Sequence, residues 1–248
     1  HRGLVHEYFT VGRSDGLAAI LEGVRGGRSR VEFSITNGSE RFDPGHPFVG
    51  DDKRRAFTFR WARTLLGEGD PSRHIAYQGD PYDDPARVLV LGFGFHWDQN
   101  AQADSTPARF WQATADLTWR HQGSYANLQI FFRRNQAGGT EDLAANDDDL
   151  GFQVMVAHFL IPRRLELAGR LGWMEYASHR DPGGDLIEVT FGFSYYWKNE
   201  DDRFQGHRLR VTVDLGYAER VEEESGLLGW PEGHGRGWQF RSLVTFLF

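Results

Sequence analysis

The chain has 248 residues with a net charge of −7, no cysteine, 40% hydrophobic and 14% aromatic residues. The lack of cysteine excludes a disulfide framework and a thiolate metal site, and the acidic balance argues against nucleic acid as a partner. The longest apolar run, residues 88–95, falls far short of the roughly 20 residues of a membrane-spanning helix. A helical membrane protein is therefore excluded, whereas a β-barrel, in which only alternate residues must be apolar, stays open.

Hydrophobic residues alternate with period two along most of the chain, which predicts about eleven or twelve strands. Many of them are longer than the usual five or six residues of a soluble sheet, and they match the roughly 9–11 residues that cross a bilayer on a tilt. In chain order the predicted strands are residues 5–11, 17–24, 31–36, 57–64, 89–97, 111–120, 127–133, 152–160, 165–173, 187–198, 207–220 and 238–248.

The last predicted strand shows the pattern most clearly. Its apolar face carries Trp238, Phe240, Val244, Phe246 and Phe248, while the other face is mixed. A strand that ends on an outward-facing Phe resembles the C-terminal strand of bacterial outer-membrane β-barrels.

Two folds explain the alternation. A soluble sandwich would bury the apolar face against a second sheet, whereas a transmembrane antiparallel β-barrel would turn that face to lipid and the charges to a wet lumen. Strand length favours the barrel, as does the position of tryptophans near strand ends on the apolar face, where an aromatic girdle belongs. We expect a single all-β domain over residues 1–248. The expected lipid-facing girdle is Trp97, Trp119, Trp173, Trp197, Trp238 and Phe248.

The connections support the same fold, because long loops and short turns should alternate along a barrel. Counted from the C-terminus, the long connections are residues 221–237 and 135–149, and tight turns are expected at residues 161–164 and 121–124. Residues 67–85 break the rhythm, since a short turn is expected there.

The polar face carries the candidate pore-lining residues. Arginine donates bidentate hydrogen bonds to phosphate or carboxylate, so a column of arginines could pass anions between weak sites. The alternative is that the arginines pair with carboxylates on the same face and only brace the wall. The expected lining residues are Arg60, Arg120, Arg170, Arg208, Arg210, Arg241, Asp116, Glu188 and Asp214.

Other chemistry is weakly indicated. Residues 146–149, Asn-Asp-Asp-Asp, form either a solvated acidic loop or an oxygen site for Ca²⁺, although their spacing is not that of an EF-hand. The histidines lack tight metal spacing, and no nucleophile is placed with a base. We expect no enzyme activity, no cofactor and no metal site.

Several short segments, in order, are similar to the phosphate-selective porin O and P family. They are Gly12-Arg13-Ser14 with Gly16-Leu17, residues 27–38, 115–119 and 151–162, and residues 190–198 followed by 206–209. The resemblance implies a porin that is generally trimeric and conducts small solutes, often anions. Members have about sixteen strands and this chain resembles their later portion, which leaves open whether N-terminal strands precede it.

The leading hypothesis is an outer-membrane porin of a bacterium, a passive channel for small hydrophilic solutes, including anions such as phosphate. Its expected partners are membrane lipid, the solutes and two further copies in a homotrimer, with no nucleic acid. The alternative is an outer-membrane barrel with a structural or adhesive role through its external loops, and a third reading is a soluble β-sandwich binder.

Overall fold

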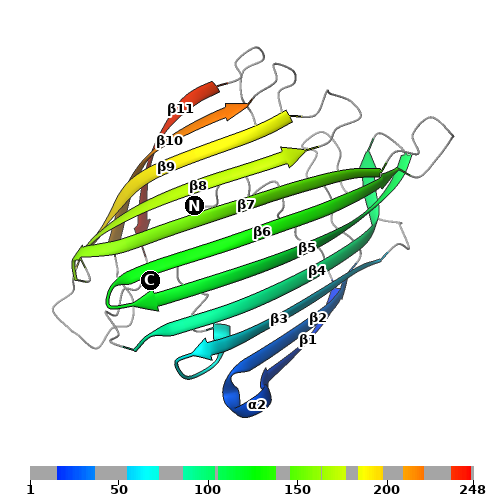
Figure 1. Cartoon of the computed structure of the whole chain (residues 1–248), viewed down its shortest axis with the longest axis horizontal. Coiled ribbons are helices and arrows are strands. Elements are labelled where there is room, and N and C mark those ends of the chain that lie inside the picture. The colour runs from blue at the N-terminus through cyan, green and yellow to red at the C-terminus, as the bar shows by residue number, and fades with distance from the viewer. Residues whose placement is uncertain are drawn as a thin grey trace.

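The computed structural model describes residues 16–36, 55–72, 86–103, 106–137, 146–162, 164–176, 184–197, 209–220 and 236–246. These residues form one antiparallel sheet of 11 strands in sequence order, β1 to β11 (Figure 1). Every strand pairs with its neighbours in the sequence, so the sheet is a continuous meander. The all-β, antiparallel prediction is confirmed.

Most strands are longer than the sequence pattern predicts, and the only helix that lies wholly within the described residues is a single turn, α2 (Val24–Gly27). The strands are β1 (Gly16–Gly23), β2 (Ser29–Thr36), β3 (Ala56–Leu66), β4 (Val88–Ala103), β5 (Thr106–His121), β6 (Ser124–Ala137), β7 (Asn146–Ile161), β8 (Leu165–Tyr176), β9 (Gly184–Trp197), β10 (Leu209–Arg220) and β11 (Arg236–Phe246).

Two connections show how local sequence sets the meander. The tight turn expected at residues 121–124 is a two-residue hairpin loop, in which Gln122 (φ 47°) and Gly123 (φ 73°) both have positive φ, as a type I′ turn requires. The connection after β4 is shorter than expected, because β4 runs to Ala103 and β5 begins at Thr106. The strand expected at residues 5–11 lies outside the described residues.

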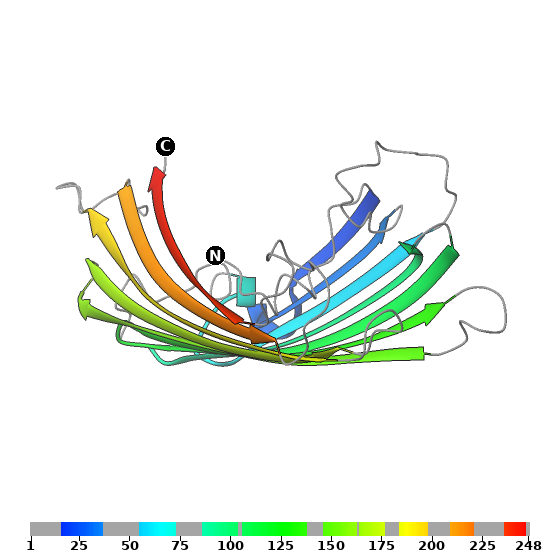
Figure 2. The ribbon, with the colours of Figure 1, turned by 90° about the horizontal axis from the view of Figure 1, so that it is seen from above.

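The sheet is strongly curved but not closed. Figure 2 shows it as an open trough, with β1 and β11 at its two rims. All the connections at one end of the trough, which we call the loop end, follow the even-numbered strands; those at the turn end follow the odd-numbered strands.

Side-chain burial is inverted relative to a soluble protein. Phe93 is 42% exposed and Phe191 is 60% exposed, whereas Asp116 on the opposite face of the same sheet is only 6% exposed. Asp70, in the connection after β3, lies beside Arg30 of the polar face, and Figure 2 draws the start of this connection inside the trough. The polar face is therefore the concave, inner face, and the apolar face is the convex, outer one.

Candidate functional site: the polar inner face

The inner face is built by alternate residues of every strand, because side chains of a strand point to opposite faces with period two. Its described arginine and carboxylate side chains are mostly buried or half-buried, and the two kinds occur in nearly equal number. On the strands they are Glu22, Arg30, Glu32, Arg60, Asp98, Asp116, Arg120, Arg133, Asp149, Glu166, Arg170, Glu188, Arg210, Asp214 and Arg241.

The first ion pair spans three strands. Arg60 of β3 donates from Nη2 to Asp116 Oδ1 of β5 at 2.9 Å, passing over β4. The register sets Gly94 beside Arg60 and Gly92 beside Asp116. A Cβ at Gly92 would lie 2.5 Å from the Asp116 carboxylate oxygens. The lack of a side chain at Gly92 therefore makes room for this pair.

A second pair joins β8 and β9. Arg170 Nη2 lies 2.6 Å from Glu188 Oε1, with side-chain exposures of 8% and 5%. Thr190 completes the group, since its hydroxyl accepts from Arg170 at 3.2 Å and donates to Glu188 Oε1 at 3.2 Å. The pair is therefore sheltered from solvent and joined by a third polar group, and such additional hydrogen bonds help to stabilise a buried ion pair.

A third pair lies at the β11 rim. Arg241 donates from Nε to Asp214 Oδ1 of β10 at 2.6 Å, and the register sets these two residues opposite each other. Three of the proposed lining arginines thus pair with the three carboxylates predicted to line the pore. The bracing alternative describes these arginines better than a column of free cations.

A tyrosine and an arginine surround Glu166 near the turn end. Tyr196 donates its hydroxyl to Glu166 Oε2 at 2.6 Å, and Arg210 lies over the Tyr196 ring at 5.4 Å. Arg210 also donates to Thr212 Oγ1 at 2.9 Å and to Ser194 Oγ at 3.3 Å. Within the described residues no carboxylate lies within 4 Å of Arg210, which leaves its guanidinium half-buried among neutral acceptors and an aromatic ring.

Arg120 lies on the same part of the inner face. Its guanidinium stands 5.7 Å from the Tyr125 ring of β6, and the Arg120 side chain is buried. Arg120 and Arg210 are thus both lining arginines with an aromatic neighbour, the surroundings in which a guanidinium gains cation–π stabilisation. Arg208, the remaining candidate, lies outside the described residues.

The loop end carries polar residues that sequence reasoning missed as lining candidates. Arg133 donates from Nε and Nη2 to Gln112 Oε1 at 3.2 and 2.9 Å, and its guanidinium lies 5.2 Å from the Phe110 ring. His96 Nδ1 shares a hydrogen bond of 2.8 Å with Thr58. The period-two pattern could have found Arg133, because this residue falls on an inward position at the end of the predicted strand 127–133.

The outer face is apolar between two aromatic ends. Trp97 stacks at 5.5 Å on Phe57, and Trp173 lies 5.7 Å from Phe152, both toward the loop end. Trp238, also toward the loop end, is 71% exposed. Trp119 and Trp197 are exposed toward the turn end, so five of the six expected girdle residues lie on the outer face near its two ends. Phe248 lies outside the described residues.

The height of this face can be compared with a bilayer. On β9 the outward side chains from Ile187 to Trp197 are all apolar or aromatic. Ten residue steps extend about 34 Å along a strand, and a tilt of about 40° reduces this to about 26 Å, close to the apolar band of roughly 25 Å on membrane barrels.

The acidic segment at residues 146–149 is not a loop. Its residues open β7, where Asp149 is buried on the inner face and Asp148 is exposed on the outer face. Asp148 binds Arg134 of β6 through two hydrogen bonds of 2.6 Å. Because neighbouring carboxylates of a strand point to opposite faces, Asp148 and Asp149 cannot bind one calcium ion together. The described residues contain no group of three or more His, Cys, Asp or Glu side chains that could hold a metal ion.

The part of the chain that the structure describes has no helix with the length and hydropathy needed to cross a membrane. Comparisons with protein-family models, curated proteins and solved structures found no match. The resemblance to the phosphate-selective porin O and P family stays a prediction.

Proposed function

We propose that this protein is a porin of the bacterial outer membrane, a passive channel for small hydrophilic solutes. The observation that carries the proposal is the inverted sheet: its convex face exposes a continuous apolar surface with aromatic ends, and its concave face holds the charges. A lipid bilayer satisfies the first face and a water-filled lumen satisfies the second.

The outer face argues against a soluble binder. A monomeric soluble protein rarely exposes an apolar patch larger than a few hundred Å². Here large apolar side chains are exposed on every strand from β1 to β11, among them Leu17, Phe33, Phe95, Phe193 and Phe240. The described residues form a single sheet, whereas a sandwich would cover this face with a second one.

The inner face favours hydrophilic solutes in general rather than phosphate in particular. Its polar wall would spare solutes the cost of entering hydrocarbon, which is several kcal/mol for each unsatisfied polar group. Arg60, Arg170 and Arg241 each have a carboxylate partner, so the positive charge of these residues is offset locally. A homotrimer belongs to the same proposal and comes from the family resemblance alone.

The test is single-channel recording of the purified full polypeptide in planar lipid bilayers. The porin proposal expects stepwise currents whose size scales with salt concentration. Bilayers that stay silent, although the protein is inserted and folded, would contradict it and favour a structural or adhesive barrel. A protein that is monodisperse in buffer without detergent would instead support the soluble binder.

A further inference from the structure

The connection that follows β3 breaks the rhythm of short turns, and its first residues fold back over the inner face. We call residues 67–72 the inner strap. Gly67 and Gly69 both have φ of +91°, a left-handed conformation that favours glycine. A Cβ at Gly67 would lie 3.1 Å from Val88 Cγ2 of β4, so the strap starts in contact with the sheet. Figure 2 shows the end of the strap inside the trough.

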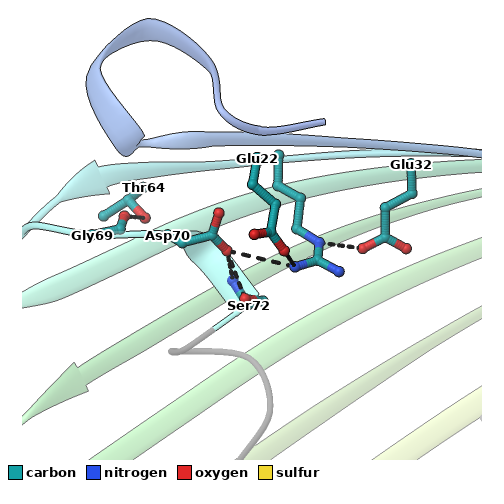
Figure 3. Close-up of polar contacts among 7 residues, drawn as sticks. Glu22, Glu32, Thr64, Gly69, Asp70 and Ser72 are labelled. Atoms are coloured by element: carbon teal, nitrogen blue, oxygen red, sulfur yellow. Dashed lines mark hydrogen bonds and ion pairs between the residues drawn. The ribbon is translucent and has the colours of Figure 1, made fainter. Parts of the chain in front are cut away.

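Polar contacts hold the strap in this position. Thr64, at the end of β3, donates its hydroxyl to the Gly69 carbonyl at 3.1 Å. The Ser72 amide and hydroxyl donate to Asp70 Oδ1 at 2.8 and 2.6 Å (Figure 3), and the Pro71 side chain between them is fully buried. The strap is thus a folded element packed on the sheet.

Arg30 of β2 joins the strap to the neighbouring strands. Its guanidinium contacts Glu22 of β1 and Glu32 of β2, each at 2.5 Å, and lies 3.9 Å from Asp70 of the strap (Figure 3). One positive charge therefore meets three carboxylates. The Glu22 side chain is 61% exposed and that of Glu32 is 38% exposed, so the excess negative charge faces solvent on the concave side.

We propose that the inner strap narrows the channel at the turn end, that Arg30 is the residue that positions it, and that Glu22, Glu32 and Asp70 make this narrow point favour cations. Carboxylate groups at a constriction attract cations and repel anions at close range. This inference rests on the proposed porin function and deepens it, since it predicts the sign of the selectivity and the element that sets it.

Channel recordings test the strap through a pair of variants. Arg30→Ala and Arg28→Ala remove the same charge from nearby positions at the start of β2, but the Arg28 side chain is exposed and holds no strap contact among the described residues. We expect Arg30→Ala to raise the single-channel conductance and Arg28→Ala to leave it unchanged. In a salt gradient the parent channel should show a reversal potential that favours cations, and Glu22→Gln with Glu32→Gln should reduce that preference.

A second measurement keeps the inference independent of channel activity. The chain has no cysteine, so Val88→Cys introduces a unique thiol at a buried position beneath the start of the strap. We expect this thiol to react slowly with a water-soluble maleimide. Adding Arg30→Ala should accelerate the reaction about fivefold, which corresponds to about 1 kcal/mol, whereas adding Arg28→Ala should not.

The outcomes separate the two claims. A silent parent protein would overturn the porin proposal, and the thiol reaction would still test the strap. A conducting parent that prefers anions would overturn the selectivity claim. Equal conductance and equal thiol reactivity in Arg30→Ala and Arg28→Ala would overturn the role of Arg30, with the porin proposal intact.

Discussion

On strand β9, consecutive residues have opposite surroundings. Glu188, Thr190 and Ser194 are buried on the inner face, whereas Val189, Phe191 and Phe193 are exposed on the outer face. A soluble sheet sorts the same residue types the other way round, because water favours charges outside. This difference between the two faces is what we expect if the convex side meets an apolar solvent, as the proposed function requires.

The two faces also differ in how they gain stability. The inner face relies on ion pairs and hydrogen bonds between neighbouring strands, including Arg170–Glu188 and Tyr196–Glu166. The outer face offers apolar area that contributes only after transfer into an apolar phase. A substitution that removes a charge from the inner face and one that adds a charge to the outer face should therefore lower the free energy of unfolding by different amounts.

The largest loss in the free energy of unfolding is expected at the sheltered pair Arg170–Glu188. Arg170→Met leaves the Glu188 charge buried beside an apolar group, and breaking a buried pair costs about 3 to 5 kcal/mol. Urea titration of the protein folded into lipid vesicles measures this free energy of unfolding. The double variant with Glu188→Gln should recover much of the loss. A cost below about 1 kcal/mol, as for an exposed pair, would show that water reaches this pair freely.

The second-largest loss in the free energy of unfolding is expected in the middle of the outer face. Phe191→Arg places a charge where the account puts hydrocarbon, which costs about 2 to 4 kcal/mol near the bilayer midplane. Phe191→Leu, which keeps the position apolar, is the matched control for the same titration. If the arginine variant were as stable as the leucine variant, this face would be in water, and the contrast between the two faces would be lost.

The sequence pattern predicted some of the strand structure and missed part of it. The period-two pattern predicted the faces of residues 88–97 and 187–197, because a strand turns each second side chain the same way. It did not predict that β4 and β5 extend to an almost direct hairpin, since residues 99–107 are small or polar and lack alternation. In this segment the pairing of β4 with β5, rather than burial of apolar side chains, keeps the chain extended.

The candidate site was partly predictable. The period-two pattern placed Arg60 and Asp116 on one face. Their contact across an intervening strand depends on the curvature of the sheet and on the space left at Gly92. Arg30 lies just before the strand predicted at residues 31–36. The pattern was therefore not used to place Arg30 on the same face as Glu32. The fold of residues 67–72 onto the sheet had no periodic signal, because left-handed glycines and capping contacts build it.

A third effect, of about 1 to 3 kcal/mol, is expected from overpacking the inner face. A Cβ at Gly192 would lie 2.7 Å from the Val213 carbonyl oxygen, so Gly192→Ala must move backbone. At Gly216 the nearest atom would be the Thr190 hydroxyl at 3.4 Å, which makes Gly216→Ala the control with little cost. Equal thermal stability of the two variants would contradict the close packing of the inner wall.

The smallest effect is expected at the loop-end rim of the outer face. Arg134 and Asp148 form an exposed pair with side-chain exposures of 39% and 43%. Such pairs contribute at most about 1 kcal/mol, so Arg134→Ala should shift the urea midpoint only slightly. A loss as large as that of Arg170→Met would mean that this rim is buried, and the apolar face would not end where its tryptophans do.

The most direct test of the central claim is a spin-label scan along residues 189–194 of the cysteine-free chain in lipid vesicles. Each site is labelled singly, and its collisions with oxygen, which concentrates in lipid, are compared with those of a water-soluble nickel complex. The account predicts an alternation in which Val189, Phe191 and Phe193 favour oxygen and Thr190, Gly192 and Ser194 do not. The opposite phase, or the absence of any alternation, would contradict an apolar exterior around a hydrated interior.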